Sequence, residues 1–414
     1  MFSSGTAVAL AAEWNKIYDT HEHFGFYWDY SPDAPPYGLR NVLNGAYLSP
    51  PAELGNDYEE IGKFLKSKKG ADTLNSLRAA FLQLYDLDIF PLRADVLKDL
   101  DVCIQDAYKG PASIYRRLEK RAGVKKIILD NPPKLWEKWS DPLVNMTIRL
   151  DETIFPFSKV RQDIYQRNTK DSKVFSYMKS ESLPAANLDD FDEALESYML
   201  KLKEYAHVIK IGSAYQRTLD FSLEENDDGK IADLYRRLME GSGTFSEHEM
   251  RRWGNYVVSI MLGFATIERM PVQVHTGLAL MRESDPRYLS EIVGQFSSVK
   301  FDLFHGGYPY INQLAGMALT KANVFVDLCW LPILSQSATR TLLLQLMELG
   351  VSNKINGFGG DCQNFEGSYG ALLMTKKALA DVFLEKIESN DIAREDAVHL
   401  GEQILYDNPR EIFG

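Results

Sequence analysis

The sequence predicts an α/β protein of the (β/α)8 type, a TIM barrel. Short apolar segments with strand character alternate with amphipathic helical segments along most of the 414 residues. Such alternation indicates a parallel sheet whose strands are joined by helices, and eight strand segments match the count of a barrel. An open doubly wound sheet is the alternative, but no glycine-rich nucleotide-binding loop follows the first strand.

The strand segments are recognised by β-branched and aromatic residues followed by polar or glycine-rich turns. The first covers residues 17–23 and ends in two histidines. The other seven are 124–129, 145–150, 207–211, 271–275, 300–305, 323–328 and 355–361. Apolar residues at helical spacing predict helices at 189–205, 247–269, 313–321, 337–349 and 368–387.

The chain is longer than a bare barrel, which needs about 250 residues. Residues 41–123 show helical periodicity and no convincing strand, so we expect one barrel domain over 1–414 with a helical insertion at 41–123. A second long segment, 155–189, follows the third strand. Because the insertion is suited to cover a site or to form a contact between subunits, we expect a homo-oligomer.

Composition limits the partners of this chain. Hydrophobic residues make up 45% and charged residues 25%, as in globular proteins, and the net charge of -12 argues against nucleic-acid or membrane partners. No apolar run is long enough to span a membrane. Three scattered cysteines suit a reducing cytoplasm, and an N-terminus without a basic region does not fit a signal peptide, so we expect a cytoplasmic protein. We also expect its partner to be a small-molecule substrate.

Polar residues stand where several predicted strands end. In a barrel these ends meet at one face, which carries the active site. His21 and His23 point to the same side of an extended backbone. The other strand-end residues are Lys210, His275, His305 and Asp361. Three or four imidazoles and one carboxylate form a site for Zn, Mn or a related ion, with a position left for water.

Each of these residues also has a simpler interpretation. A lone histidine at a strand end is more often a hydrogen-bonded core residue, and Asp361 after two glycines fits a turn. The joint pattern favours the metal site. His207, His248 and His399 fall outside it, and we interpret them as structural or surface residues.

Four motifs, DTHEHF, VQVHTG, LFHGGYP and GGDCQN, together with the C-terminal segment 404–413, resemble the amidohydrolase superfamily of metal-dependent barrels. Within it the chain is similar to the amidohydrolase-related group that includes the N-terminal domain of FluG-like proteins and, more distantly, uronate isomerases. The resemblance spans nearly the whole chain outside the helical insertion.

The resemblance implies roles for the strand-end residues. His21 and His23 bind the metal, and His275 is a third ligand or lies beside it. Asp361 binds the metal and acts as general base toward its water. His305 is a ligand in a two-metal site or a substrate contact in a one-metal site. We expect one divalent ion, zinc first, with manganese, iron or nickel as alternatives.

Lys210 has two interpretations. Some relatives carry a carboxylated lysine that bridges two metals at the fourth strand. The alternative is an inward-facing lysine that binds substrate or pairs with a carboxylate, and it accords with the single metal that we favour.

A carboxylate-bearing substrate is suggested by Arg149 and Arg217, because arginine binds carboxylates through two contacts. Tyr215, Tyr308 and Trp330 follow strand ends and are candidates for lining its pocket. The alternatives are ion pairs at the rim for the arginines and packing roles for the aromatic residues.

These features favour a metal-dependent hydrolase acting on an amide, lactone or ester. The alternatives are isomerisation of a sugar acid, as in uronate isomerases, a related lyase or decarboxylase reaction, and a decayed barrel that only binds. By the resemblance, uronate isomerases carry two tryptophans after the seventh strand, whereas here Trp330 stands alone between Cys329 and Leu331. This difference favours hydrolysis.

Overall fold

The computed structural model describes residues 4–24, 36–55, 57–109, 114–130, 141–222, 228–241 and 243–414. Within these ranges, an eight-stranded sheet has the order β1-β2-β3-β6-β8-β9-β10-β11, which follows the chain. The strand pairings within it are parallel. With helices between the strands, this is the predicted (β/α)8 TIM barrel fold, and the prediction is confirmed.

The strands of the sheet lie within or overlap the eight predicted segments. They are β1 Ile17–Glu22, β2 Val124–Leu129, β3 Val144–Arg149, β6 Ala206–Ile211, β8 Val272–Val274, β9 Phe301–Leu303, β10 Val324–Asp327 and β11 Ile355–Asn356. The last predicted segment, 355–361, is too long, because its glycine-rich second half leaves the strand after Asn356. The backbone of that half nevertheless remains hydrogen-bonded to the β1 segment.

The chain divides into two compact units. Unit 1 contains Met1–Asn145 and Asp327–Ile412, with Gly414, and unit 2 contains Met146–Val326, with Phe413. Each is described by itself.

In unit 1 the first strand segment is hydrogen-bonded to the last. The Thr20 N–H donates to the Phe358 carbonyl over 2.9 Å, so the first strand segment lies beside the last. On its other side β1 pairs with β2 in parallel. The helices outside the 41–123 segment are α1 Gly5–Glu13, α14 Leu331–Leu334, α15 Gln336–Glu348, α16 Phe365–Glu388, α17 Arg394–Glu402 and α18 Asn408–Phe413.

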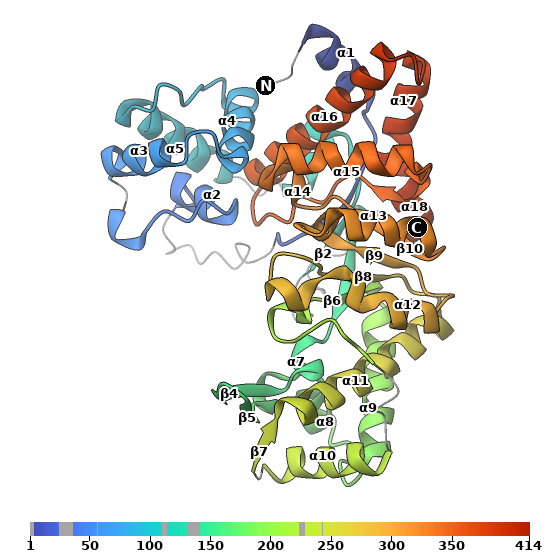
Figure 1. The fold of residues 1–414 in the computed structure, drawn as a ribbon. Coiled ribbons are helices and arrows are strands. Elements are labelled where there is room, and N and C mark those ends of the chain that lie inside the picture. The colour runs from blue at the N-terminus through green and yellow to red at the C-terminus, as the bar shows by residue number, and fades with distance from the viewer. Residues whose placement is uncertain are drawn as a thin grey trace. The chain divides into compact units, whose positions relative to one another are not determined.

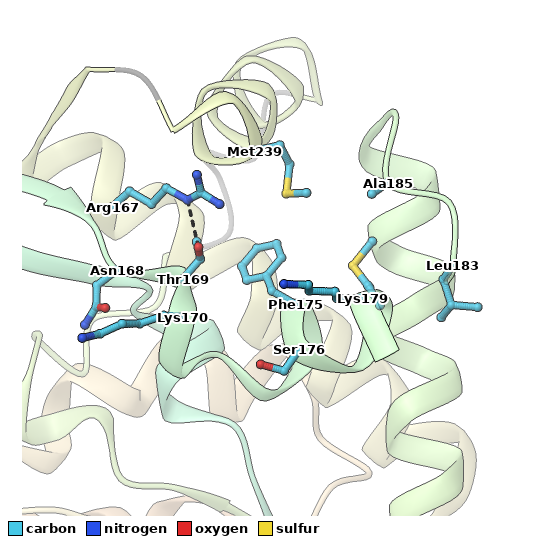
Figure 2. A pocket seen from close by; sticks show the side chains of 11 residues that line it. Arg167, Asn168, Thr169, Lys170, Phe175, Ser176, Lys179, Leu183, Ala185 and Met239 are labelled. Atoms are coloured by element: carbon cyan, nitrogen blue, oxygen red, sulfur yellow. Dashed lines mark hydrogen bonds between the residues drawn. The ribbon is translucent and has the colours of Figure 1, made fainter. Parts of the chain in front are cut away.

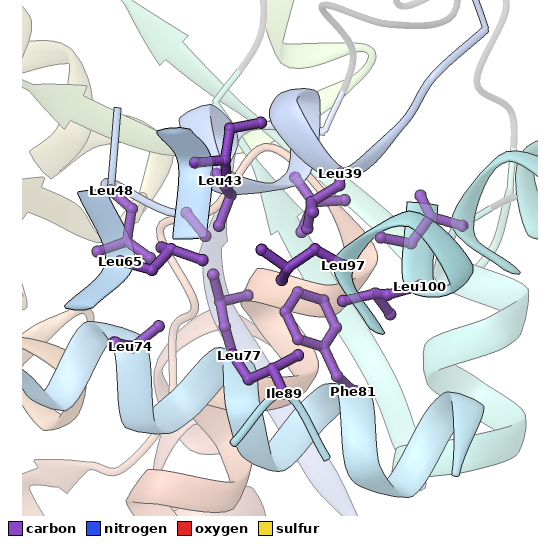
Figure 3. Close-up of a cluster of buried hydrophobic side chains, with 14 of the residues drawn as sticks. Leu39, Leu43, Leu48, Leu65, Leu74, Leu77, Phe81, Ile89, Leu97 and Leu100 are labelled. Carbon is purple, nitrogen blue, oxygen red and sulfur yellow. The ribbon is translucent and has the colours of Figure 1, made fainter. Parts of the chain in front are cut away.

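Between β1 and β2, unit 1 contains a group of helices. They are α2 Leu39–Gly45, α3 Tyr58–Ser67, α4 Asp72–Tyr85, α5 Ala94–Tyr108 and α6 Ile114–Ala122, with a 3-10 turn at Ala52–Leu54. Leu74, Leu77 and Phe81 recur on one face of α4 and are buried against Leu65 and Leu97 (Figure 3). That these helices form an insertion into a single barrel domain stays a prediction.

A buried carboxylate on α16 forms hydrogen bonds with two residues of the helix group. Glu366, in the first turn of α16, accepts hydrogen bonds from the hydroxyls of Tyr85 and Tyr108, the latter over 2.8 Å. Burial raises the pKa of the Tyr108 hydroxyl, and Glu366 adds to this effect. Both phenols therefore stay protonated and act as donors.

Unit 2 carries the run β3-β6-β8-β9-β10 of the sheet. Its helices are α7 Asp151–Ile154, α8 Lys173–Ser180, α9 Leu188–Lys203, α10 Asp228–Glu240, α11 Glu247–Glu268, α12 Ser290–Gln295 and α13 Ile311–Thr320. The Ser246 hydroxyl and the Glu249 carboxylate cap the start of α11 in a capping box. No helix among the described residues of either unit is long and apolar enough to cross a membrane.

Unit 2 also contains a small antiparallel sheet that the sequence analysis missed. It consists of β4 Phe157–Arg161, β5 Ile164–Arg167 and β7 Thr244–Ser246 (Figure 1). Its first two strands lie within the long segment 155–189 that follows the third predicted strand. Most residues of β4 and β5 are exposed. The buried ones are Phe157 and Tyr165, which pack with Phe245 and Phe155.

Candidate metal centre

In unit 1, four side chains converge where β1, β2 and β11 end. His21 lies in β1 and His23 directly after it, while Asp130 follows β2 and Asp361 lies in the loop after β11. Oδ1 of Asp361 is 3.0 Å from Nε2 of His23 and 3.5 Å from Nε2 of His21. Oδ2 of Asp130 is 3.9 Å from the same His21 nitrogen. The ligand atoms of His21, His23 and Asp130 lie within 4.8 Å of one another.

The main chain fixes this convergence. The Asp361 N–H donates to the His21 carbonyl over 3.0 Å, and the His23 N–H donates to the Cys362 carbonyl over 3.0 Å. The Asp130 N–H donates to the Glu22 carbonyl over 2.9 Å. The three segments that carry the candidate ligands are thus hydrogen-bonded to one another, so the side chains start from a common framework.

The donor set fits a divalent ion. Ligands about 2.0–2.1 Å from a tetrahedral ion lie roughly 3.3 Å from each other. The two distances from Asp361 to the histidines, 3.0 and 3.5 Å, are close to that spacing. Two imidazole nitrogens and two carboxylates are ligands of Zn, and also of Mn and Fe.

The tautomer of His23 supports the same conclusion. Nδ1 of His23 lies 3.2 Å from the Asp130 carbonyl oxygen, which can only accept, so Nδ1 carries the hydrogen. In the neutral ring, Nε2 then directs a lone pair at the Asp361 carboxylate 3.0 Å away. Two facing lone pairs repel each other unless a cation or a proton lies between them. A backbone carbonyl that orients a ligating imidazole in this way is a common feature of metal sites.

Two further carboxyl groups lie beneath the ligands. Asp19 and Glu22 are both completely buried. Burial raises the pKa of each, and for Glu22 the neighbouring Asp19 is the next cause. Glu22 accepts a hydrogen bond from the Cys362 N–H over 2.8 Å, and Asp19 accepts one from the His21 N–H over 3.3 Å. These carboxyl groups therefore hold the backbone on both sides of the candidate site.

One aromatic residue of unit 1 contacts Asp361, and a second packs against the first. Tyr47, from the loop after α2, donates its hydroxyl hydrogen to the Asp361 carbonyl. The ring of Tyr47 is 4.8 Å from that of Trp330, which follows β10. Trp330, a predicted pocket residue, thus packs against the tyrosine that is hydrogen-bonded to Asp361. The sequence analysis did not single out Tyr47, because it lies in the 41–123 segment, where we found no motif.

Unit 2 brings together the other two predicted histidines. Nε2 of His305 lies 3.0 Å from Nδ1 of His275, and the Tyr215 ring is 4.5 Å from the His275 ring. Burial lowers the pKa of His275 well below its usual value, and His305 and Lys210 add to this effect. His275 is therefore neutral at pH 7. Its Nε2 atom is buried, with no hydrogen-bond partner among the described residues.

The remaining predicted residues of unit 2 are Lys210, Arg149, Arg217 and Tyr308. Lys210 is buried in β6, and its Nζ lies 3.2 Å from the centre of the Phe304 ring. Nε of Arg149, at the end of β3, is paired with Asp151 over 2.5 Å. Tyr308 follows the His305 turn, and its N–H donates to the His305 carbonyl.

Arg217 lies in a buried site of its own. Its guanidinium donates to the carbonyls of Thr218, Arg251 and Asp220 and to the Asn255 side chain. Burial lowers the pKa of Arg217 to about 9. Because its donors are already used within the fold, we leave Arg217 out of the proposed substrate site.

Asp130 is a candidate ligand that the sequence analysis overlooked. It directly follows β2, so the rule that functional residues lie at strand ends applied to it as well. In the sequence it heads the run Asp-Asn-Pro-Pro, which has the composition of a turn.

Comparison with known proteins supports the fold. No family model matches the chain. A stretch of 149 residues, 34% of this chain, is 28% identical to the protein FluG of Emericella nidulans, and the match spans 17% of FluG.

Solved structures match over the full length. A uronate isomerase from Thermotoga maritima has a TM-score of 0.75 at 15% identity, covering 100% of this chain and 98% of its own. Glucuronate isomerase from Caulobacter crescentus has a TM-score of 0.76 at 13% identity, covering 100% and 95%. A protein from Lactobacillus casei assigned as a metal-dependent hydrolase has a TM-score of 0.67 at 16% identity, covering 98% and 97%. The chain thus shares its fold with two sugar-acid isomerases and with a protein assigned as a metal-dependent hydrolase, and at the level of the fold the predicted resemblance is confirmed.

Proposed function

We propose that the chain is a divalent-metal-dependent hydrolase of a small, carboxylate-bearing amide, lactone or ester. The observation that carries this proposal is the convergence of His21, His23, Asp130 and Asp361 in unit 1. A structural ion pair would not require two imidazoles and two carboxylates to lie this close together.

The proposed ligands are His21, His23 and Asp361, with Asp130 as a fourth. Zinc is the ion we expect, with manganese, iron and nickel as alternatives. A divalent ion bound there supplies a Lewis acid, which acidifies water and polarises a carbonyl group.

Asp361 is the proposed general base. Its backbone is held on both sides, by the hydrogen bond to the His21 carbonyl and by the hydroxyl of Tyr47. With Oδ1 directed at the histidines, we assign Oδ2 to accept the proton from water. Protonated Asp361 then returns this proton to the leaving group.

The residues of unit 2 are considered by themselves. For His275 we propose a metal-binding role, because its buried Nε2 is available as a neutral donor. His305 orients that ring through the contact with Nδ1. Arg149, Tyr215 and Tyr308 remain proposed substrate contacts in unit 2, and Trp330 remains one in unit 1.

Isomerisation of a uronate is the second candidate function. It is favoured by the full-length match to two sugar-acid isomerases with TM-scores of 0.75 and 0.76. It is disfavoured by the single tryptophan, Trp330, at the place where the resemblance implies two.

The test starts with the metal content of the purified protein, beside the variants His21→Ala/His23→Ala and His399→Ala. His399 is an exposed histidine on α17 and serves as the control. We expect about one equivalent of metal in the wild type and the control, and almost none in the double variant. Equal metal in all three proteins would refute the assignment.

The metal-loaded protein is then screened with lactones, amides, esters and uronates. Hydrolysis of a lactone or ester releases a proton that a pH-stat detects, and hydrolysis of an amide releases an amine that an amine-reactive dye detects. Isomerisation of a uronate releases neither. Conversion of a uronate without proton release would replace hydrolysis by the second candidate.

A further inference from the structure

Unit 2 contains a cavity of about 700 Å³ away from the strand-end residues described above. It is lined by the end of β5, the 3-10 turn Thr169–Asp171, α8 with the loop after it, and Met239 of α10 (Figure 2). No residue of β6, β8 or β9, or of the turns after them, lines it. A volume of this size is typical of small-molecule sites, which span roughly 300–1,000 Å³.

The charge of the lining is unusual for this chain. Its charged residues are Arg167, Lys170 and Lys179, and no carboxylate lines the cavity, although the chain as a whole carries a net charge of -12. None of the three cations has an ion-pair partner among the described residues. Cations that gather without carboxylates attract an anion.

Arg167 is held in position. Its Nε donates to the Thr169 hydroxyl over 2.8 Å, which leaves the two terminal nitrogens to face a ligand. Gly241, in a left-handed conformation with φ of +69°, provides room for this side chain, since a Cβ there would lie 2.5 Å from an Arg167 terminal nitrogen. Two parallel N–H groups of arginine match a carboxylate or phosphate group.

The opposite wall is apolar. Figure 2 shows the ring of Phe175 between the Arg167 guanidinium and the Lys179 amine, with the Met239 side chain across from it. Met178 and Leu183 complete this surface. The Lys170 amine points the other way, toward Asn168. The cavity thus combines two inward cations with a flat apolar surface.

We propose that this cavity binds a small organic anion that joins a carboxylate, phosphate or sulfonate group to a flat apolar part. Arg167 and Lys179 bind the anionic group, and Phe175 and Met239 pack against the apolar part. The proposal does not rest on the proposed function, because no residue of the candidate metal centre takes part.

The test uses naphthalene-2-carboxylate and its uncharged analogue naphthalene-2-carboxamide, titrated into the full-length protein by calorimetry. We expect the carboxylate to bind with a Kd of about 1 mM or below, and the amide to bind roughly tenfold more weakly or not at all. Arg167→Ala and Lys179→Ala should each weaken binding of the carboxylate by roughly tenfold. Phe175→Ala should weaken both probes.

Two controls make the result specific. Lys170→Ala removes the same charge from the same lining, but its amine points away from the cavity, so binding should change less than about twofold. His23→Ala, in unit 1, should also leave binding unchanged.

Each alternative result overturns the proposal. Equal weakening by Lys170→Ala would show diffuse charge attraction, and equal affinity for both probes would show apolar binding alone. Loss of binding in His23→Ala, or full binding in Arg167→Ala, would place the probe elsewhere. No binding at about 10 mM would show that the cavity is not a site for such anions.

Discussion

Nε2 of His23 lies 3.0 Å from Oδ1 of Asp361, although the two residues come from the first and the last strand segments of the sheet. The contact is supported by the main-chain bonds from Asp361 to His21 and from His23 to Cys362. The hydrogen bonds between the two backbone segments therefore hold the side chains of His23 and Asp361 close together. The predictions below test how this arrangement works.

The carboxylate of Asp361 should be needed for turnover more than for binding. Asp361→Asn keeps the shape and the backbone bonds but removes the basic oxygen, so we expect kcat to fall by roughly 10²–10⁴ while substrate affinity changes little. Steady-state kinetics with matched metal content measure this. Unchanged kcat would remove Asp361 from the role of base.

Asp130 should contribute to metal affinity. Asp130→Asn retains the backbone carbonyl that orients His23 but loses the charge facing His21, so we expect metal affinity to fall by roughly 10–100-fold. Competition with a chelator of known affinity measures the change. Asp163→Asn, an exposed carboxylate in unit 2, is the control. If both variants retain wild-type affinity, Asp130 is a structural residue.

Gly360 should tolerate no side chain. A Cβ at this position would lie 2.0 Å from Oε1 of the fully buried Glu22. Gly360→Ala should therefore lower the free energy of unfolding by about 1–3 kcal/mol, as expected for overpacking. Urea unfolding measures the loss.

The matched control for Gly360 is Gly316→Ala in α13. A Cβ at Gly316 meets nothing within 4 Å. Because alanine favours a helix over glycine, this change should stabilise the protein by about 0.5–1 kcal/mol. A Gly360→Ala variant as stable as the wild type would show that Glu22 moves aside easily.

Lys376 should make stability depend on alkaline pH. Burial lowers the pKa of Lys376 from 10.5 to about 8, and its amine donates to the Trp14 carbonyl over 2.6 Å. Between these two pH values the unfolded chain binds more protons than the folded chain, so stability rises with pH across this window. Below about pH 8 the lysine is charged in both states, and this contribution is constant.

The variant Lys376→Met tests this linkage. It should remove the rise, which amounts to at most about 1.4 kcal/mol per unit of pKa shift. Lys377→Met, one residue along and paired with Asp381, should keep it. The measurement is the free energy of unfolding at pH 7.5, 9 and 10 under identical salt, and the same slope in all three proteins would contradict the prediction.

The barrel could be predicted from the sequence because its strands and its helices repeat their apolar residues at different spacings. Buried strands are short apolar runs, whereas α11 and α16 repeat their apolar residues at helical spacing, so the alternation is visible without tertiary information. The small sheet of β4, β5 and β7 was missed because its strands are short and mostly exposed, so they show no alternation of apolar and polar residues. Their pairing depends on Phe245, which is distant in sequence.

The candidate site was predictable where a strand end carried a distinctive residue. His21, His23 and Asp361 met that condition, and unit 1 brings them together. Asp130 was hidden in a turn-like run, and Tyr47 in a segment without motifs. The burial of Arg217 could not be predicted, because most of its hydrogen-bond acceptors are backbone carbonyls. Every residue has a backbone carbonyl, so no residue type in the sequence indicates such a partner.

The pairing of the Thr20 N–H with the Phe358 carbonyl also dictates an order of events during synthesis. His21 and His23 leave the ribosome more than three hundred residues before Asp361. A half-made chain therefore contains His21, His23 and Asp130 but lacks Asp361, and the complete set of proposed ligands forms only after the last strand segment has paired with the first. We expect metal to be captured after translation, by the finished molecule, so that an abandoned or truncated chain does not deplete the cell's supply.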